Sequence, residues 1–149
     1  MKRGKELQKN IPLVNLDDFP EAGAIAFGTP TRFEVVSAQL KNQIDRLSPL
    51  WLEGALEGKP AGIFVSTSTP HGGQGMTIFS LLPALLHLGM IFVGIPYSVK
   101  ELYYTKGGGS PYGPGHLAGT DNLREIDEER TILRAFGKRL AKIGLKLQK

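Results

Sequence analysis

Three continuous apolar runs, separated by helical patterns, constrain the fold of this chain more than any other feature. The runs cover residues 24–27, 61–65 and 90–95, and apolar residues recur at helical spacing across 36–47 and 74–88. Continuous apolar runs are typical of parallel strands that are covered on both faces. Because helices connect successive runs, the order predicts a doubly wound α/β sheet with right-handed crossovers.

The length of the chain indicates one domain. A chain of 149 residues can bury one sizeable core but not two comfortable ones. We therefore predict a single domain over 1–149, with a polar stub at 1–10 and a long Gly/Tyr-rich loop at 98–123. A final amphipathic helix is predicted from the spacing of Leu133, Phe136, Leu140, Ile143 and Leu147.

Composition excludes several classes of site and favours a cytoplasmic protein. The chain has no cysteine, which excludes disulfides, thiolate metal sites and cysteine nucleophiles. Its net charge of +4 lies largely at the two ends, a pattern more typical of solvated surfaces than of a nucleic-acid interface. The apolar stretch 78–97 is interrupted by proline and glycine, so we expect a buried helix and strand and no membrane span. No secretory leader pattern is evident.

Two polar loops follow the first two apolar runs and are the best candidates for a ligand site. The first is GTPTRF at 28–33, and the second is STSTPHGGQ at 66–74. Ligands of open parallel sheets bind outside the carboxyl ends of the strands. Arg32 offers planar donors and Phe33 an apolar wall, which matches the two ends of a flavin ring. Hydroxyls and glycines before a helix start leave N–H groups free for a carbonyl or anion. The alternative is that the first loop is simply a strand-to-helix turn and the second an ordinary flexible loop.

Other chemistries have little support in the sequence. There is no GxSxG nucleophile elbow and no GxxxxGK[ST] phosphate loop. The histidines do not have the spacing of metal ligands, so we predict no metal site. Taken alone, His87 and Trp51 are more typical of packing residues than of site residues.

Four linked motifs resemble the flavodoxin-like WrbA family of FMN-dependent NAD(P)H:quinone oxidoreductases. They are AIAFGTPTRF, LWLEGALEGKPAGIFVSTSTPHGGQ, LLHLGMIFVGIPYS and GGGSPYGPGHLAG, in family order and spacing from about Ile11 to the end. The resemblance implies an enzyme that passes hydride from NAD(P)H to FMN and then two electrons to a quinone. The cofactor supplies this chemistry, and no side chain acts as a covalent catalyst.

The resemblance also implies roles for particular residues and a tetrameric assembly. Trp51 would wall the substrate site against a neighbouring subunit's flavin, and the Gly/Tyr-rich loop would be an assembly arm. The implied cofactor-binding residues are Thr31, Arg32, Phe33, Ser66, Thr67, Ser68, Thr69, Pro70, His71 and His87.

The sequence departs from the family at its beginning and beside Phe33. The first two strands and the phosphate loop of the flavodoxin-like order are not recognisable, so we expect weakened FMN binding. The first strand present would be an exposed edge open to pairing. Glu34 stands where the family usually has glycine and would disfavour a negatively charged reduced flavin if it points inward. The alternative function is a flavin-free interaction and oligomerisation module or an inactive remnant.

Overall fold

A computed structural model describes residues 9–120 and 126–148 of the chain. Most of the predicted polar stub, residues 1–8, and part of the predicted long loop, residues 121–125, lie outside the described residues. The elements in chain order are α2 (Asp18–Glu21), β1 (Ile25–Pro30), α3 (Ala38–Asp45), α4 (Ser48–Leu52), β2 (Pro60–Thr67), α5 (Gln74–His87), β3 (Ile91–Phe92), α6 (Glu101–Tyr104), β4 (Gly115–Leu117) and α7 (Asp127–Leu147).

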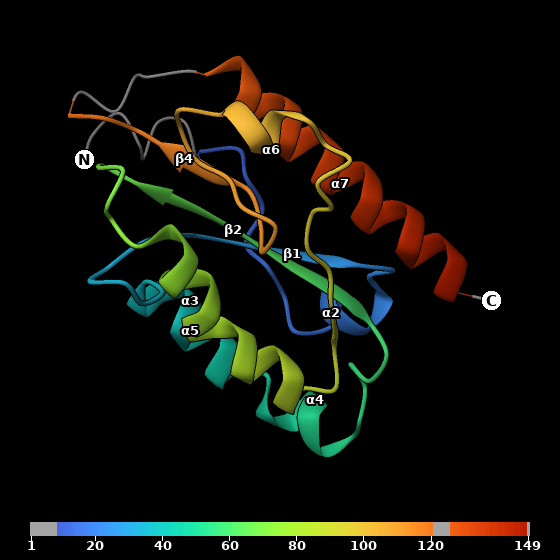
Figure 1. Cartoon of the computed structure of the whole chain (residues 1–149). Helices are drawn as coiled ribbons and strands as arrows, with labels where there is room; N and C mark the ends of the chain where they lie inside the picture. The colour runs from blue at the N-terminus through green and yellow to red at the C-terminus, as the bar shows by residue number, and fades with distance from the viewer. Residues whose placement is uncertain (1–8, 121–125, 149) are drawn as a thin grey trace.

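A parallel sheet forms the middle layer of the molecule (Figure 1). Strand β1 pairs with β2 from Ile25 opposite Ala61 to Pro30 opposite Ser66. Strand β3 pairs with the start of β2, and β4 pairs with its end. Since β1 runs along one edge of β2, β3 and β4 share the other edge. The carboxyl ends of β1, β2 and β4 therefore meet at one edge of the sheet, which we call the carboxyl edge; the opposite one is the amino edge.

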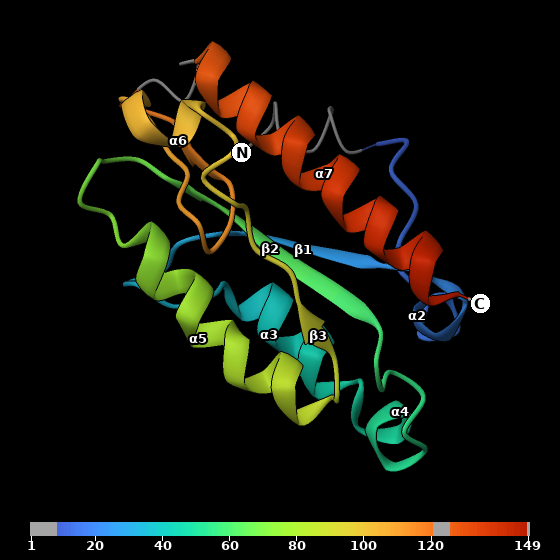
Figure 2. The ribbon, with the colours of Figure 1, turned by 45° about the vertical axis from the view of Figure 1, so that its right-hand side comes forward.

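Helices cover both faces of this sheet, as the sequence predicted. Figure 2 shows α3, α4 and α5 on one face and α6 and α7 on the other. The larger core cluster, which includes the fully buried Leu47, Ile63 and Leu81, lies under the first group. A smaller cluster around Ile132 and Phe136 lies under α7. Burial on both faces is the physical reason that the strands read as continuous apolar runs.

The predicted third strand and long loop differ from the structure. Strand β3 is shorter than the predicted run 90–95, and the segment expected to be a loop contains α6 and β4. Gly94, just after β3, lies against a later part of the same segment. A Cβ at this position would lie 2.3 Å from the carbonyl oxygen of Pro111. The segment between β3 and β4 thus folds back on its own chain, so that the two short strands divide one edge of β2 between them.

Strand β1 is an edge strand within the described residues, where β2 is its one partner. On the face that α7 covers only in part, Ala26 and Gly28 are exposed, and Phe64 of the neighbouring strand is 37% exposed. This arrangement agrees with the expectation of an open apolar edge at the first apolar run.

The part of the chain that the structure describes contains no helix that could span a membrane. None of its helices combines the length and the apolar character needed to cross a bilayer.

Candidate functional site

The two polar loops lie against each other at the carboxyl edge. We call residues 31–36 the first loop and residues 68–73 the second loop. The N–H of Thr31 donates to the carbonyl oxygen of Ser66 at 2.9 Å, which extends the pairing of β1 with β2. The hydroxyl of Thr77, in the first turns of α5, donates to the Thr31 hydroxyl at 2.7 Å. The two segments predicted to share a site are therefore hydrogen-bonded together at one edge of the sheet.

A tight hairpin forms the first loop. The N–H of Arg32 donates to the carbonyl of Val35 at 2.8 Å, and the reverse bond measures 3.1 Å. Between them, Phe33 and Glu34 have φ angles of 54° and 66°, the pair of left-handed residues that a type I′ turn requires. The Phe33 side chain is 100% exposed. The hairpin thus projects an apolar ring from the carboxyl edge, free of contact with the described residues.

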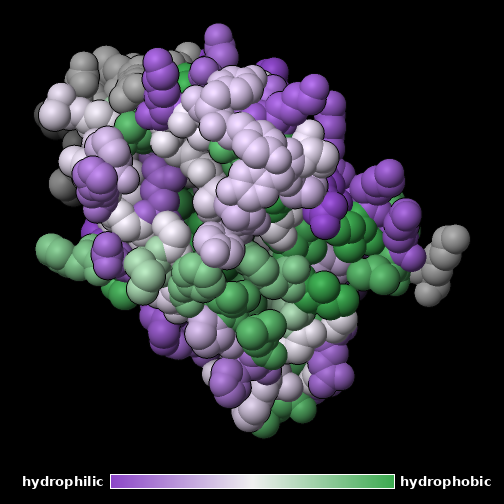
Figure 3. Space-filling model, in the orientation of Figure 1, coloured by the Kyte–Doolittle hydropathy of each residue, from purple (hydrophilic) through white to green (hydrophobic). Residues whose placement is uncertain are grey.

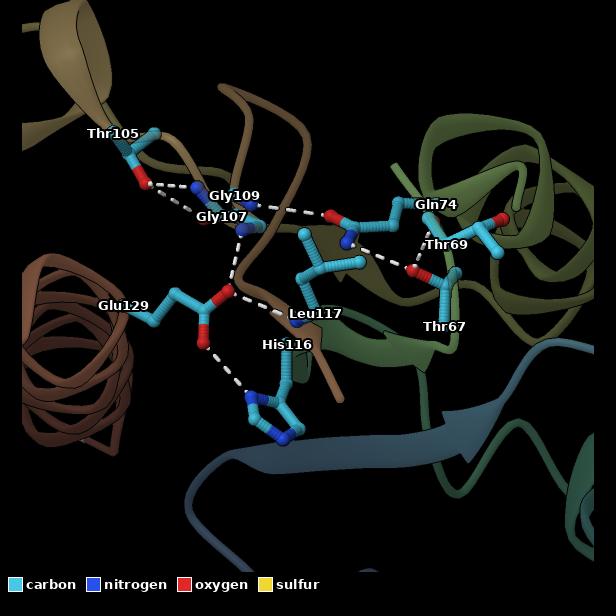
Figure 4. Close-up of polar contacts among 10 residues, drawn as sticks. Thr67, Thr69, Gln74, Thr105, Gly107, Gly109, His116, Leu117 and Glu129 are labelled. Atoms are coloured by element: carbon cyan, nitrogen blue, oxygen red, sulfur yellow. Dashed lines mark hydrogen bonds and ion pairs between the residues drawn. The ribbon is translucent and has the colours of Figure 1, made fainter. Parts of the chain in front are cut away.

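Internal hydrogen bonds shape the second loop. The buried Thr67 hydroxyl donates to the carbonyl of Thr69 at 3.0 Å and accepts from the Gln74 side chain at 3.1 Å. The side-chain amide oxygen of Gln74 accepts in turn from the N–H of Gly109 at 3.1 Å (Figure 4). Because its hydroxyl is occupied internally, Thr67 is placed to position the loop, whereas Ser68, Thr69, Pro70 and His71 are exposed.

A buried carboxylate fixes β4 beside these loops. Glu129 of α7 accepts from the N–H of Gly108 at 2.5 Å and from the N–H of Leu117 at 2.9 Å. Its second oxygen lies 2.8 Å from Nδ1 of His116. Figure 4 draws this contact together with the bond to Leu117. These contacts join α7, β4 and the segment before β4, so the end of β4 is held at the carboxyl edge.

Sequence reasoning did not identify the residues that position the loops, which are Gln74, Thr77, His116 and Glu129. Thr77 could have been noticed as a polar residue one turn into an otherwise apolar helix. Glu129 offered no such signal, because it belongs to the acidic run Asp127–Glu129 that suits a helix N-terminus.

The structure does not bring Trp51 and His87 to the loops of the same chain. His87 ends α5, a helix of 14 residues that starts at the carboxyl edge, so it lies roughly 20 Å away at the amino edge. Trp51 of α4 also lies toward the amino edge, since the segment after α4 leads directly into the start of β2. Both side chains are exposed.

The carboxyl edge carries a donor set that fits the ring of a flavin. The N–H groups of Phe33, Glu34, Ser68 and Thr69 make no hydrogen bond to any residue in 9–120 or 126–148. Free N–H groups suit the carbonyl oxygens of the pyrimidine end, and the exposed Phe33 ring suits the apolar end. The acidic or imidazole clusters that hold a metal ion are absent from the described residues.

The chain matches a protein family and several known proteins. Residues 16–103 match the family model described as NADPH-dependent FMN reductase. An NAD(P)H dehydrogenase (quinone) of Trichlorobacter lovleyi is 47% identical over 141 residues, which cover 93% of this chain and 69% of that protein. A protein with the same description from Aromatoleum aromaticum is 40% identical over 146 residues, covering 96% of this chain and 70% of that protein.

A solved structure supports the fold. The flavodoxin, WrbA-like protein from Agrobacterium tumefaciens matches with a TM-score of 0.66 and 24% sequence identity, covering 87% of this chain and 71% of that one. The fold is therefore flavodoxin-like, with a parallel sheet. Together these matches confirm the resemblance that the four sequence motifs predicted.

Proposed function

This chain belongs to the NADPH-dependent FMN reductase family, and we propose that it is an FMN-dependent NAD(P)H:quinone oxidoreductase. The observation that carries the proposal is the pair of loops joined at the carboxyl edge, with free N–H groups and an exposed aromatic ring. The proposal also draws on the activity in the names of the relatives. It includes a cytoplasmic location, with which a chain without cysteine is compatible.

The residues of this chain would bind and orient the flavin rather than react covalently. Bound FMN supplies hydride acceptance from NAD(P)H and two-electron transfer to a quinone. Phe33 would pack against the ring, and the N–H groups of Phe33, Ser68 and Thr69 would donate to its carbonyl oxygens. Thr31 and Thr67 have hydroxyls already bonded within the protein, so their role would be to hold the loops in register. The cofactor-binding residues of the proposal remain Thr31, Arg32, Phe33, Ser66, Thr67, Ser68, Thr69, Pro70 and His71.

We propose that the described residues grip the ring of FMN but not its phosphate. In the flavodoxin-like strand order, β1, β2 and the edge that β3 and β4 share would take the last three positions, and residues 9–120 and 126–148 contain no further strand of the sheet that could take the first two. A single charge-assisted hydrogen bond to a phosphate contributes about 1.5–3 kcal/mol, which is at least about tenfold in affinity.

Titration of the flavin-free protein with FMN and with riboflavin, which lacks the phosphate, tests the proposed flavin binding and the proposed absence of a phosphate grip. We expect both ligands to bind, with dissociation constants that differ by less than about tenfold, measured by quenching of flavin fluorescence. Bound FMN should then be reduced by NAD(P)H and reoxidised by a soluble quinone. A protein that binds neither flavin contradicts the proposed function, and a strong preference for FMN contradicts the missing phosphate grip.

Assembly of several copies of the chain would bring Trp51 and His87 of one copy to the flavin site of another. Helix α5 is apolar on two sides, because the outward-facing Met76, Phe79 and Leu86 are 55%, 39% and 57% exposed. Together with Pro83 they follow helical spacing, and a helix that is apolar all round is usually buried. Figure 3 shows an apolar band across the middle of the face that α5 presents. We propose a homo-oligomer, a tetramer by family resemblance, in which Trp51 and His87 of one subunit meet the flavin of another.

Leu86→Lys is expected to shift the protein from an oligomer to smaller species. Full burial of a leucine contributes about 1.5–3 kcal/mol, and a lysine at this place would introduce an unpaired charge into the interface. Leu145→Lys is the control, because Leu145 of α7 is also exposed, at 71%, but lies on the other face of the sheet. Sedimentation velocity measures the outcome. A monomeric parent protein, or equal sedimentation of parent and Leu86→Lys, contradicts assembly through α5.

The open edge of β1 supports the second candidate function, a flavin-free interaction module. An edge strand with an exposed apolar face is a template for pairing with another chain. Strand β1 has an open edge within the described residues, beside the exposed Ala26, Gly28 and Phe64. This candidate predicts stable oligomers without flavin, and a well-behaved flavin-free monomer counts against it. An inactive remnant would also fail to bind flavin, and it would form no stable oligomer.

A further inference from the structure

The side chain of Glu34 lies between the two loops at the carboxyl edge. A Cβ at position 73 would lie 2.5 Å from Cγ of Glu34 and 2.8 Å from its Oε1. Gly73 has a φ of 81° and Glu34 a φ of 66°. The left-handed turn of the first loop therefore directs the Glu34 side chain onto the bare backbone of Gly73, where no other residue type would leave room for it.

This carboxylate has no polar partner within the described part of the chain. It makes no hydrogen bond or ion pair to residues 9–120 or 126–148; the Arg32 guanidinium beside it in sequence donates to the carbonyl of Thr31 at 2.9 Å instead. Gly73 is the N-cap of α5, and because it has no side chain it gives the first turn of that helix no side-chain acceptor. The negative charge thus lies close to the end of the helix that attracts anions.

We propose that Glu34 is a specificity-determining residue that weakens the binding of a flavin ring and lowers its reduction potential. The inference rests on the proposed function and deepens it. The carboxylate and its stem occupy space between the loops that must receive the ring, so they have to move aside when the ring binds. Reduction adds electrons to the ring, and a carboxylate beside it disfavours the added negative charge.

The bulk and the charge of Glu34 make separable contributions. The bulk acts through contact, which is independent of ionic strength, whereas the charge acts through solvent at an exposed position and is screened by salt. Glu34→Gln removes the charge and keeps nearly the same volume. Glu34→Gly removes both and also relieves the left-handed backbone, which glycine adopts freely.

Glu57 provides a matched control at the other end of the molecule. It lies on Gly89, which has a φ of 73°, and a Cβ at position 89 would lie 2.7 Å from Cγ of Glu57. Gly89 follows the end of α5, and its carbonyl accepts from the N–H of Gly58 just before β2, so this contact is at the amino edge. Glu57→Gln changes the net charge of the protein by the same amount as Glu34→Gln, away from the loops.

The experiment compares riboflavin binding and reduction potential in the parent chain, Glu34→Gln, Glu34→Gly and Glu57→Gln. At low salt, we expect Glu34→Gln to bind oxidised riboflavin about as tightly as the parent chain does and the reduced form about tenfold more tightly. For a two-electron couple this tenfold difference raises the potential by about 30 mV. Glu34→Gly should bind at least as tightly as Glu34→Gln at any salt concentration. Glu57→Gln should match the parent chain in both measurements when each is made in the Leu86→Lys background, where the amino edge of another subunit does not reach the flavin.

The outcomes separate this inference from the proposed function. If the parent chain binds flavin and both Glu34 variants match it in affinity and potential, the role of Glu34 is overturned while the proposed function stands. If no variant binds riboflavin or FMN, the proposed function is overturned, and the role of Glu34 falls with it. As a readout without flavin, the thermal midpoint of Glu34→Gly should exceed that of the parent chain, since relief of the turn stabilises the folded state.

Discussion

Replacing Glu129 with alanine is expected to lower the free energy of unfolding by about 3–5 kcal/mol. Glu129 is 5% exposed, and its carboxylate is the shared partner of the N–H groups of Gly108 and Leu117 and of the His116 ring. Each buried donor left without a partner costs about 1–3 kcal/mol. Loss of the carboxylate also releases α7 from β4, so the carboxyl edge should lose order along with stability.

Urea denaturation followed by circular dichroism measures this effect, with Glu129→Gln as the matched variant. The glutamine oxygen can still accept from the two backbone N–H groups, while its amide group would face Nδ1 of His116 and require the other ring tautomer. We expect this variant to lose about 1 kcal/mol. Equal midpoints for Glu129→Ala and the parent chain would show that the contacts of Glu129 are not needed for stability.

The positions of β1, β2 and α7 could be predicted because their signals are local. Continuous apolar runs marked the two strands, and a regular helical period marked the last helix. Strand β4 could not be predicted in this way. Its sequence, Gly115, His116 and Leu117, has no strand signature, and the strand exists because Val65 to Thr67 of β2 offer it an edge. A long-range partner decides such an element, and a single sequence does not show that partner.

The loops of the candidate site were predictable in position but not in shape. Their polar residues follow the strands directly, so the carboxyl edge was expected to gather them. The hairpin that gives Phe33 and Glu34 positive φ angles depends on the paired hydrogen bonds between Arg32 and Val35, for which no Asn-Gly or Asp-Gly signal is present. For Trp51 and His87, resemblance pointed to a site that one copy of the chain does not assemble, because a helix crossing the sheet carries its last residue to the opposite edge.

Gly113→Ala is expected to lower the free energy of unfolding by about 2–4 kcal/mol. A Cβ at this position would lie 2.1 Å from the carbonyl oxygen of Ile63 in the central strand and 3.2 Å from Cδ1 of Ile78. The Ile63 carbonyl is backbone and cannot turn away as a side chain could, so the segment before β4 would have to move outward. That movement would strain the bond from the N–H of Val65 to the carbonyl of Pro114, now 3.0 Å.

Gly137→Ala is the matched control, and its effect should have the opposite sign. Gly137 lies within α7 and is exposed, and apart from the adjacent backbone of its own helix no described residue has an atom within 4 Å of the position that a Cβ would take. Alanine there should stabilise the protein by about 0.5–1 kcal/mol, because glycine loses more conformational freedom in a helix. Urea midpoints that move in opposite directions would locate the cost of Gly113→Ala in the close approach to β2. If both urea midpoints moved in the same direction, the two substitutions would act through the general effect of losing a glycine. Close packing against β2 would then not be what holds β4.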